Sequence, residues 1–524
     1  MKNTSLYIIY LLCGVFLTTF AQNKSSTKIL LIPLDDRPPC LQFPTKMGLI
    51  GDVEIITPPR EMLGKFLDFG KSDEMIAWIS TQDLTTFDAA IISIDMLAYG
   101  GLVASRVYET TYEKGIKRAK FANIIREKAP KIKIYGSSVI MRLAPTGDGK
   151  NEAYREKLSK WAEISPDEKQ KSLTEKLENE IPKEALSNYK SARERNLKIN
   201  IFAIQLTKNK VFDYLILSQD DAKPKGVHIK NREILSKFVE ENKLNENVAI
   251  QPGADEVSML LLARSMTDKH NYHPKIKAIY SSESMADKAM PFEDRPLRQT
   301  VSFHIKAVGG VEVFDPKQAD ICFFVFTSRF ENGRAKSFAD EIINFSKKSK
   351  KGIIIADIDP KGDVQGGDIA FTESLKSEAI FSKIHGYASW NTAGNAIGTA
   401  LPHGILYGVS REITKKIPQK VILAKMNEAQ TWFMINRLLD DYSYHSVVRP
   451  MAGKMIRENK WNAFRLTDEQ TKITEEFCTK ELRPIAEKTV EHFYKKKALS
   501  LPNFNFDLPW NRTFEAEIDC QINK

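Results

Sequence analysis

Charged side chains follow an apolar run in the stretch from Lys28 to Pro39, KILLIPLDDRPP. The run ends in Asp35, Asp36 and Arg37, and two prolines follow. This pattern is typical of a buried strand that carries charged side chains to one edge of a sheet. An arginine beside carboxylates keeps them ionised, which suits a ligand clamp, a nucleophile or a weak base. The alternative is a local ion pair that only fixes the loop.

Two more apolar runs end in acids. LSQDDA places Asp220 and Asp221 after a run, and QPGADE places Asp255 and Glu256 after the next. Paired carboxylates can perform acid–base chemistry on a glycosidic bond, or hold Mg²⁺ or Ca²⁺. Asp255 could equally be the N-cap of the following helix, with Glu256 in its first turn. Because strand carboxyl ends meet at one sheet edge, we expect one polar, mostly acidic cleft.

The stretch SIDMLAYGGLVASR adds Asp95 and Tyr99 as candidate ligand contacts. Its adjacent glycines, Gly100 and Gly101, predict a loop whose backbone approaches a ligand closely. Arg142 follows another apolar run and is expected to contact an anion or to pair with one of the acids.

A neutral motif, SWNTAGNAIGTALPHG, follows the last predicted strand. Asn391 and Asn395 are candidates to hydrogen-bond a hydroxyl-rich ligand, with Trp390 as a stacking surface. The alternative is that its small residues allow tight helix–sheet packing.

No Gly-x-Ser-x-Gly elbow, His-Glu-x-x-His pair or phosphate-binding loop is present. We expect no organic cofactor. Binding of a divalent cation is a second possibility, for instance at Asp357 and Asp359. The alternative for these two residues is a solvated acidic turn.

Strands and helices alternate through most of the chain, which predicts an α/β fold of two Rossmann-like parallel-sheet units facing a common cleft. A β/α barrel is the alternative. The first unit spans 27–270, with a polar helical insertion or lid at 150–198; the second spans 271–412. Residues 413–524 predict a helical C-terminal region with an extended, aromatic tail that packs on the body.

The two units share an order of elements. In both, a strand and a helix precede a short strand ending in proline, GDVEIITPP in one and GGVEVFDP in the other. A long apolar strand, FDAAIISID or ADICFFVFTS, comes next. We interpret this as a repeated architecture, whether or not the halves share an ancestor.

Residues 1–21 resemble a secretory signal, with Lys2, an apolar stretch and a small-residue cleavage site. We therefore expect a secreted or periplasmic protein without stable membrane insertion after cleavage.

The formal net charge is +10, but the lysines form no basic block with interleaved aromatics, so no nucleic-acid partner is indicated. The widely spaced cysteines contain no Cys-x-x-Cys pair and do not suggest zinc.

Several motifs taken together resemble a bacterial family known as domain of unknown function 4127. They are PLDDRP, ISIDMLAYGGLVASR, SQDDA, GADE and ASWNTAGNAIGTAL. The resemblance extends from about Lys28 to Glu515 and implies an enzyme-like scaffold. It implies no particular reaction.

Three functions fit these patterns. The first is a carbohydrate hydrolase, with carboxylates as acid and base or nucleophile and Arg37 and Arg142 as clamps. The second is a non-catalytic protein that binds a small solute or a glycan. The third is a metal-dependent hydrolase of phosphate or other esters.

Overall fold

The structure is a computed structural model that describes residues 26–416, 420–494 and 501–522. The predicted signal segment, 1–21, lies outside the described residues.

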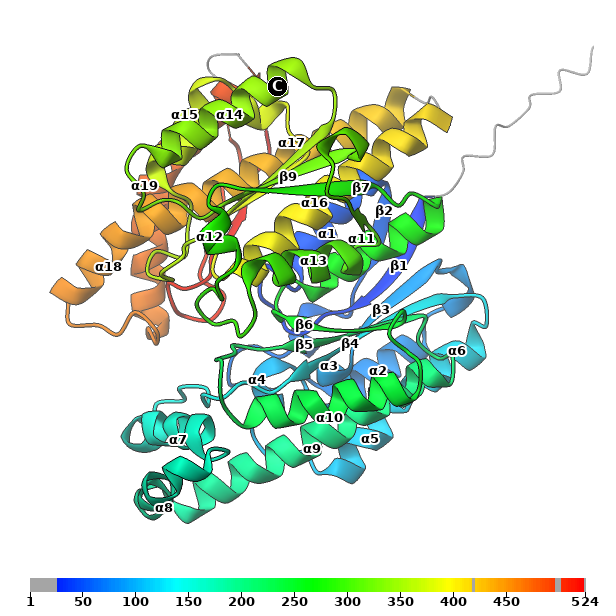
Figure 1. The fold of residues 1–524 in the computed structure, drawn as a ribbon, viewed down its shortest axis with the longest axis vertical. Helices are drawn as coiled ribbons and strands as arrows, with labels where there is room; N and C mark the ends of the chain where they lie inside the picture. Colours follow the sequence, from blue (N-terminus) through cyan, green and yellow to red (C-terminus); the bar gives the residue numbers. More distant parts are fainter. Residues whose placement is uncertain (1–25, 417–419, 495–500, 523–524) are drawn as a thin grey trace, which may run out of the picture.

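The first unit is built on a parallel six-stranded sheet in the order β2-β1-β3-β4-β5-β6 (Figure 1). Ile29 pairs with Ile55 on one side and with Ala89 on the other, which places the first strand inside the sheet. Both faces of such a sheet are covered, which explains the nearly continuous apolar runs. The strands are β1 (Thr27–Ile32), β2 (Val53–Ile56), β3 (Ala89–Ser93), β4 (Lys133–Ile140), β5 (Tyr214–Gln219) and β6 (Val248–Pro252).

The second unit is a parallel five-stranded sheet in the order β11-β10-β9-β7-β8. Counted from its own first strand, its order is 2-1-3-4-5, the order in which the first sheet also begins. The predicted repeated architecture is therefore confirmed at the level of topology. The strands are β7 (Lys275–Tyr280), β8 (Val311–Glu312), β9 (Ile321–Phe326), β10 (Gly352–Asp357) and β11 (Gly386–Ala388).

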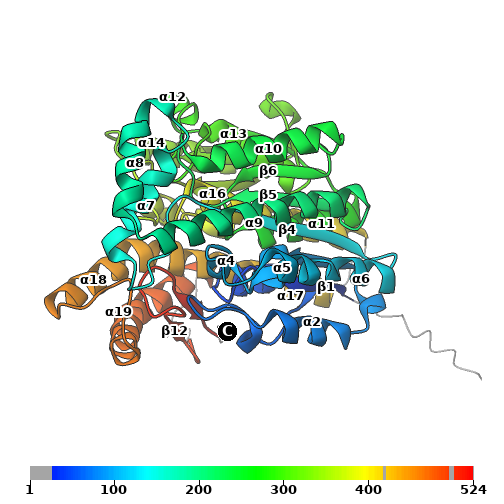
Figure 2. The same cartoon turned by 90° about the horizontal axis from the view of Figure 1, so that it is seen from below.

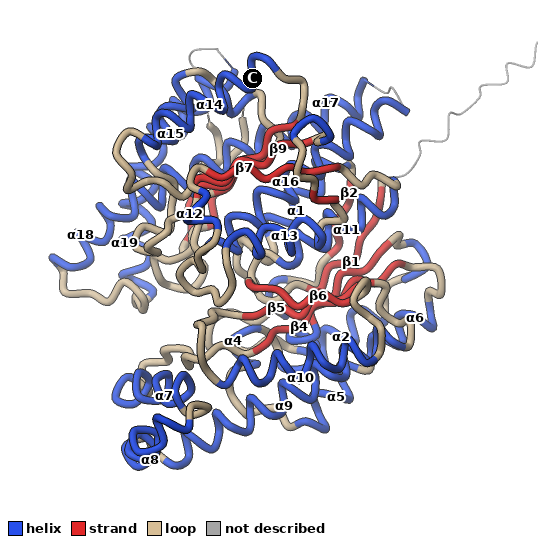
Figure 3. Tube along the Cα trace, viewed as in Figure 1, coloured by secondary structure: helices blue, strands red, loops and turns tan. Residues whose placement is uncertain are grey.

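A layer of helices lies between the two sheets (Figures 1 and 3). One hydrophobic core runs through this layer and joins Ile29 of the first sheet, Leu260 of the helix layer and Ile354 of the second sheet. The two units are therefore packed on a shared set of helices. These are α1 (Gln42–Gly48), α11 (Val257–His270), α13 (Leu297–Ala307) and α16 (Ala393–Lys416).

Other helices cover the outer faces of the sheets (Figure 1). On the first sheet they pack in a second core that includes Met75, Ile199 and Leu235. On the second sheet, Phe338 and Phe371 belong to a third core. The outer helices include α2 (Ser72–Ser80), α3 (Ile94–Tyr99), α5 (Tyr112–Ala119), α9 (Lys183–Lys208), α10 (Val227–Glu241), α14 (Arg334–Lys348) and α15 (Ile369–Ser377).

The segment 150–198 is helical, as predicted. It forms α7 (Glu152–Ile164), α8 (Lys171–Glu180) and the first part of α9. Trp161 and Leu177 pack there with Leu143, which follows β4, in a small separate core. Figure 2 shows α7 and α8 at the side of the molecule where the C-terminal helices also lie.

The described part of the C-terminal region is mainly helical and ends in an extended tail, as predicted. Trp510 of the tail donates its indole N–H to Asp36 at 2.6 Å, so the tail packs on the first unit. The elements are α17 (Lys420–Arg437), a π-helix (Leu438–Val448), α18 (Arg449–Glu458), α19 (Asp468–Tyr494), β12 (Asn505–Asp507) and β13 (Glu517–Asp519).

Among the described helices, none combines the length and the apolar character needed to cross a membrane. Cys40, Cys322, Cys478 and Cys520 are all buried, free thiols.

Candidate functional site

A cavity of about 520 Å³ lies at the carboxyl ends of strands from both sheets. The sequence motifs that end in acids and amides supply much of its wall. These residues are Arg37 after β1, Arg142 after β4, Asp220 and Asp221 after β5, Asp255 after β6, and Asn391 after β11. The convergence follows from the parallel sheets, which deliver successive loops to one edge.

The two acids of the first motif, Asp35 and Asp36, point in different directions. Asp35 is 2% exposed and does not line the cavity; its carboxylate accepts hydrogen bonds from Arg37 Nε and Nη2. Asp36 points elsewhere, toward Trp510 and Arg60, and lines a different surface hollow. Neither of the two adjacent acids therefore lines the cavity, because both lie in the bend after β1, where each has its own partners.

Two other predicted contacts, Asp95 and Tyr99, are buried in the protein. Asp95 accepts the backbone N–H of Val139 at 2.8 Å, and burial raises its pKa to about 7. The guanidinium of Arg195 lies over the Tyr99 ring, with its Cζ 4.1 Å from the centroid of that ring. These two side chains hold α3 against its neighbours and do not line the cavity.

Trp390 is also a core residue rather than a stacking surface. Its ring is 5% exposed and packs edge-on against Phe43, and its indole N–H donates to Thr399 at 2.9 Å. The packing explanation for the surrounding small residues is confirmed at Gly398, where an added Cβ would lie 2.1 Å from Glu256 Cγ.

Arg37 connects the ends of β1 and β6. It donates to both carboxylate oxygens of Asp255, at 2.6 and 3.1 Å, and it also pairs with Asp35 and Glu515. The Trp510 ring lies 4.5 Å from the guanidinium. Asp255 is therefore not the helix cap; the N-cap position of α11 is Glu256. Burial raises the pKa of Asp255, which Arg37 opposes and the charge of Asp35 reinforces.

The acids after β5 each have their own arginine. Arg106 donates to Asp220 from Nε at 3.1 Å and from Nη2 at 2.6 Å. Arg142 donates to Asp221 at 2.6 Å, which is the second of the two roles expected for this arginine. Arg106 belongs to α4 (Leu102–Ser105 and its C-cap), which follows the left-handed glycines at 100 and 101.

A second, narrow space of about 30 Å³ adjoins these acids and is lined by Asp220, Asp221, Asp255, Asn391 and Asn395. Glu293 completes its acidic lining. Burial raises the pKa of Glu293 to about 7. Its carboxylate accepts the N–H of Gly394 and the hydroxyl of Thr300, each at 2.7 Å.

The predicted amides form a chain from this space into the core. Asn391 donates to Asn395 Oδ1 at 2.6 Å, and Asn395 donates to Glu256 Oε2 at 2.7 Å. Glu256 is fully buried and faces His304 at 3.5 Å. The carboxylate of Glu256 therefore orients the amides and does not itself reach the cavity.

Backbone strain gathers around the cavity. Five of its non-glycine residues have positive φ angles, which such residues rarely adopt. They are Phe66 (49°), Asp221 (21°), Phe292 (66°), Gln365 (57°) and Asn391 (56°). Strain of this kind costs of order 1–3 kcal/mol per residue and occurs preferentially at functional sites.

The π-helix (Leu438–Val448) supports the loops of the second unit that line the cavity. Asp441 accepts the N–H of Ser389 at 2.7 Å with its carboxylate and that of Gly367 at 2.9 Å with its backbone carbonyl. Gln365 accepts the backbone N–H of Asn391 at 3.1 Å. The π-helix thus fixes the loops after β10 and β11, a use seen at many functional sites.

Sequence reasoning missed the basic and aromatic part of the wall, and the cleft is therefore not mostly acidic. Six arginines and four carboxylates line the cavity. The missed residues have no strand-end signal, because they come from turns between helices, the end of α4, the insertion and the tail. They are Phe66, Arg106, Arg155, Phe292, Phe464, Arg465, Trp510, Arg512 and Phe514.

Within the described ranges, no group of three or more histidine, cysteine or acidic side chains is arranged to hold a metal ion. Asp359 accepts the backbone N–H groups of Lys361 and Val364, and Asp357 pairs with Arg329. Asp359 thus stabilises a turn, but both side chains are buried, so the segment is not the solvated acidic turn that was the alternative.

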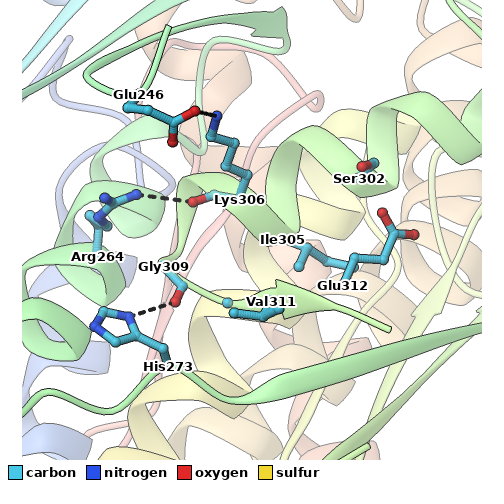
Figure 4. Close-up of a pocket in the computed structure, with 10 residues that line it drawn as sticks. Glu246, Arg264, His273, Ser302, Ile305, Lys306, Gly309, Val311 and Glu312 are labelled. Carbon is cyan, nitrogen blue, oxygen red and sulfur yellow. Dashed lines mark hydrogen bonds and ion pairs between the residues drawn. The ribbon is translucent and has the colours of Figure 1, made fainter. Parts of the chain in front are cut away.

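Another cavity, of about 400 Å³, lies beside α13 and β8 (Figure 4). None of the predicted site residues lines it. Lys306 pairs there with Glu246, and His273 Nδ1 contacts the carbonyl of Gly309 at 2.9 Å. Because the acids and amides that follow the strands line the other cavity and not this one, the cavity at the strand ends is the better candidate site.

Comparison with known proteins gives one result. A family model described as "Protein of unknown function (DUF4127)" matches residues 29–519. No curated protein and no solved structure matches the chain. The matched span covers nearly all of the described fold and every residue of the cavity wall, so the chain belongs to the DUF4127 family.

Proposed function

We propose that the protein is a hydrolase that acts on a carbohydrate through carboxylate acid–base chemistry in the strand-end cavity. The observation that carries the proposal is that Asp220, Asp221 and Asp255 line one cavity. Asn391 also lines it, and so do two exposed rings, Phe292 and Phe464. Carboxylates supply the chemistry of glycosidic cleavage, and amides and rings suit the hydroxyls and apolar face of a sugar.

Asp255 and Asp221 are the candidates for opposite roles. The pKa of Asp255 is raised by burial, which suits a group that donates a proton to the leaving oxygen. The side chain of Asp221 is 41% exposed, against 7% for Asp220 and 11% for Asp255. Asp221 is thus the most accessible base or nucleophile, and Arg142 offsets its negative charge. Asp220 is held by Arg106 and orients substrate.

The test is turnover of a panel of aryl glycosides and oligosaccharides by the wild type, Asp221→Asn and Asp255→Asn. Both variants are expected to lose kcat by about 10²-fold or more, since each removes one acid–base partner. Asp73→Asn is the matched control, because Asp73 forms an exposed ion pair with Arg118 away from the cavity. Undiminished kcat in Asp221→Asn, with a folded protein by thermal denaturation, would contradict the role of Asp221.

A non-catalytic glycan receptor is the second candidate. Each of the three cavity aspartates is already paired with an arginine, an arrangement that also suits passive ligand holding. It predicts saturable binding of an oligosaccharide with no product after prolonged incubation. Because residues 1–21 resemble a secretory signal, we propose that the protein acts outside the cytoplasm in either case.

A further inference from the structure

Two arginines of the cavity differ from the other four. Arg37, Arg106, Arg142 and Arg512 each pair with a carboxylate. Arg155 and Arg465 form no ion pair with any described acid; Arg155 Nε donates to the carbonyl of Pro145 at 2.9 Å.

These two arginines flank one loop at the cavity wall. Arg155 lies in α7, and its Nε is 3.7 Å from where a Cβ on Gly147 would stand. Arg465 lies between α18 and α19, with its guanidinium directly against Gly149. A side chain at Gly149 would meet Arg465 Nη1 at 1.2 Å. The absence of side chains at these two glycines lets both guanidinium groups approach the same loop.

The nearby acids do not neutralise the pair. Asp148 Oδ1 accepts the backbone N–H groups of Lys150 and Asn151 at 2.8 and 2.9 Å, so it is committed to the loop. Glu152 also lines the cavity but forms no ion pair with a described arginine. Two cations that form no ion pair with any described acid, on one cavity wall, favour binding of a negatively charged group.

We propose that Arg155 and Arg465 form a subsite for a carboxylate or sulfate group carried on a saccharide. The saccharide part rests on the proposed function; the anionic part rests on the two arginines alone. Arginine presents a planar set of N–H donors that matches such oxyanions. Phe464, 67% exposed beside Arg465, offers a ring for the sugar that carries the charge. The substrate class is therefore an acidic glycan.

The test is calorimetric titration of the whole chain with three probes of equal length. They are a trigalacturonide (carboxylates), a sulfated galactose trisaccharide and neutral maltotriose. The wild type is expected to bind one of the acidic probes at least tenfold more tightly than the neutral one, and the preference should weaken with added salt. Whichever acidic probe binds better identifies carboxylate or sulfate as the recognised group.

Arg155→Ala and Arg465→Ala are each expected to weaken acidic-probe binding about three- to tenfold, and the double variant should remove most of the preference. Arg457→Ala, an exposed arginine of α18 outside the cavity, is the control and should bind as the wild type does. Equal affinity for acidic and neutral probes overturns the proposal, and so does an equal loss in Arg457→Ala. A melting temperature within about 2 °C of the wild type shows that each variant is folded.

The two proposals fail separately. Arginine-dependent binding of an acidic probe without any product supports the subsite and counts against the hydrolase. Turnover of neutral glycosides with no acidic preference supports the hydrolase and overturns the subsite.

Discussion

The guanidinium of Arg37 holds both carboxylate oxygens of Asp255, at 2.6 and 3.1 Å, and so ties the end of β1 to the end of β6 across 218 residues of sequence. Strands β1 and β6 are not neighbours in the sheet order. This bridge therefore spans the carboxyl edge of the first sheet and shapes the cavity wall there.

Removing Arg37 should be strongly destabilising. Arg37→Met leaves Asp35, Asp255 and Glu515 buried without their shared counter-charge, and we expect the free energy of unfolding to fall by about 3–5 kcal/mol. Urea denaturation measures this. Arg60→Met is the control, because the Arg60 side chain is 43% exposed and should cost only about 0–1 kcal/mol. Equal losses in the two variants would contradict the bridging role.

The hydrogen bond from Trp510 to Asp36 should contribute to holding the tail on the first unit. Trp510→Phe keeps a ring beside Arg37 but removes the 2.6 Å hydrogen bond to buried Asp36. We expect a loss of about 1–3 kcal/mol in unfolding free energy, since the bond is made to a buried acid. Trp78→Phe on α2, a half-buried tryptophan outside the cavity, should cost less. The hypothesis fails if Trp510→Phe is as stable as the wild type.

Glu293 should make stability depend on pH. Its folded pKa of about 7 lies above the ordinary value of 4.5, so the folded state keeps a proton that the unfolded chain releases. The associated stability is fully present below about pH 4.5 and is lost as the pH rises to about 7, a change of roughly 3 kcal/mol.

Glu293→Gln mimics the protonated form and can still accept from Gly394 and bond with Thr300. We expect the variant to match the wild type near pH 4.5 and to exceed its stability at pH 8. Denaturant unfolding at a series of pH values tests this. A difference between the two proteins that stays constant with pH would count against a raised pKa.

Close packing of α11 on α16 should make Gly398 irreplaceable. Alanine there would place its Cβ 2.1 Å from Glu256 Cγ, and we expect Gly398→Ala to cost about 1–3 kcal/mol by overpacking. Gly115→Ala in α5 is the control, because its Cβ would meet only ordinary contacts of 3.5 Å or more. That control should be neutral or stabilising by up to about 1 kcal/mol, since alanine favours a helix.

The sequence by itself determined the two parallel-sheet units and their repeated order. Apolar runs such as those before Asp220 and Asp255, alternating with helical stretches, favour strands of a parallel sheet, and the parallel arrangement sends their polar ends to one edge. That reasoning correctly brought Arg37, Arg142, Asp220, Asp221, Asp255 and Asn391 to one cavity.

Only the tertiary structure decided which acids face the cavity and which cations accompany them. Asp35 and Asp36 are adjacent, yet one supports Arg37 and the other bonds to the tail. Arg155 and Arg465 belong to a helical insertion and a C-terminal connection that carry no strand-end pattern. Strand periodicity is a local property, whereas the meeting of segments 310 positions apart depends on how whole layers pack.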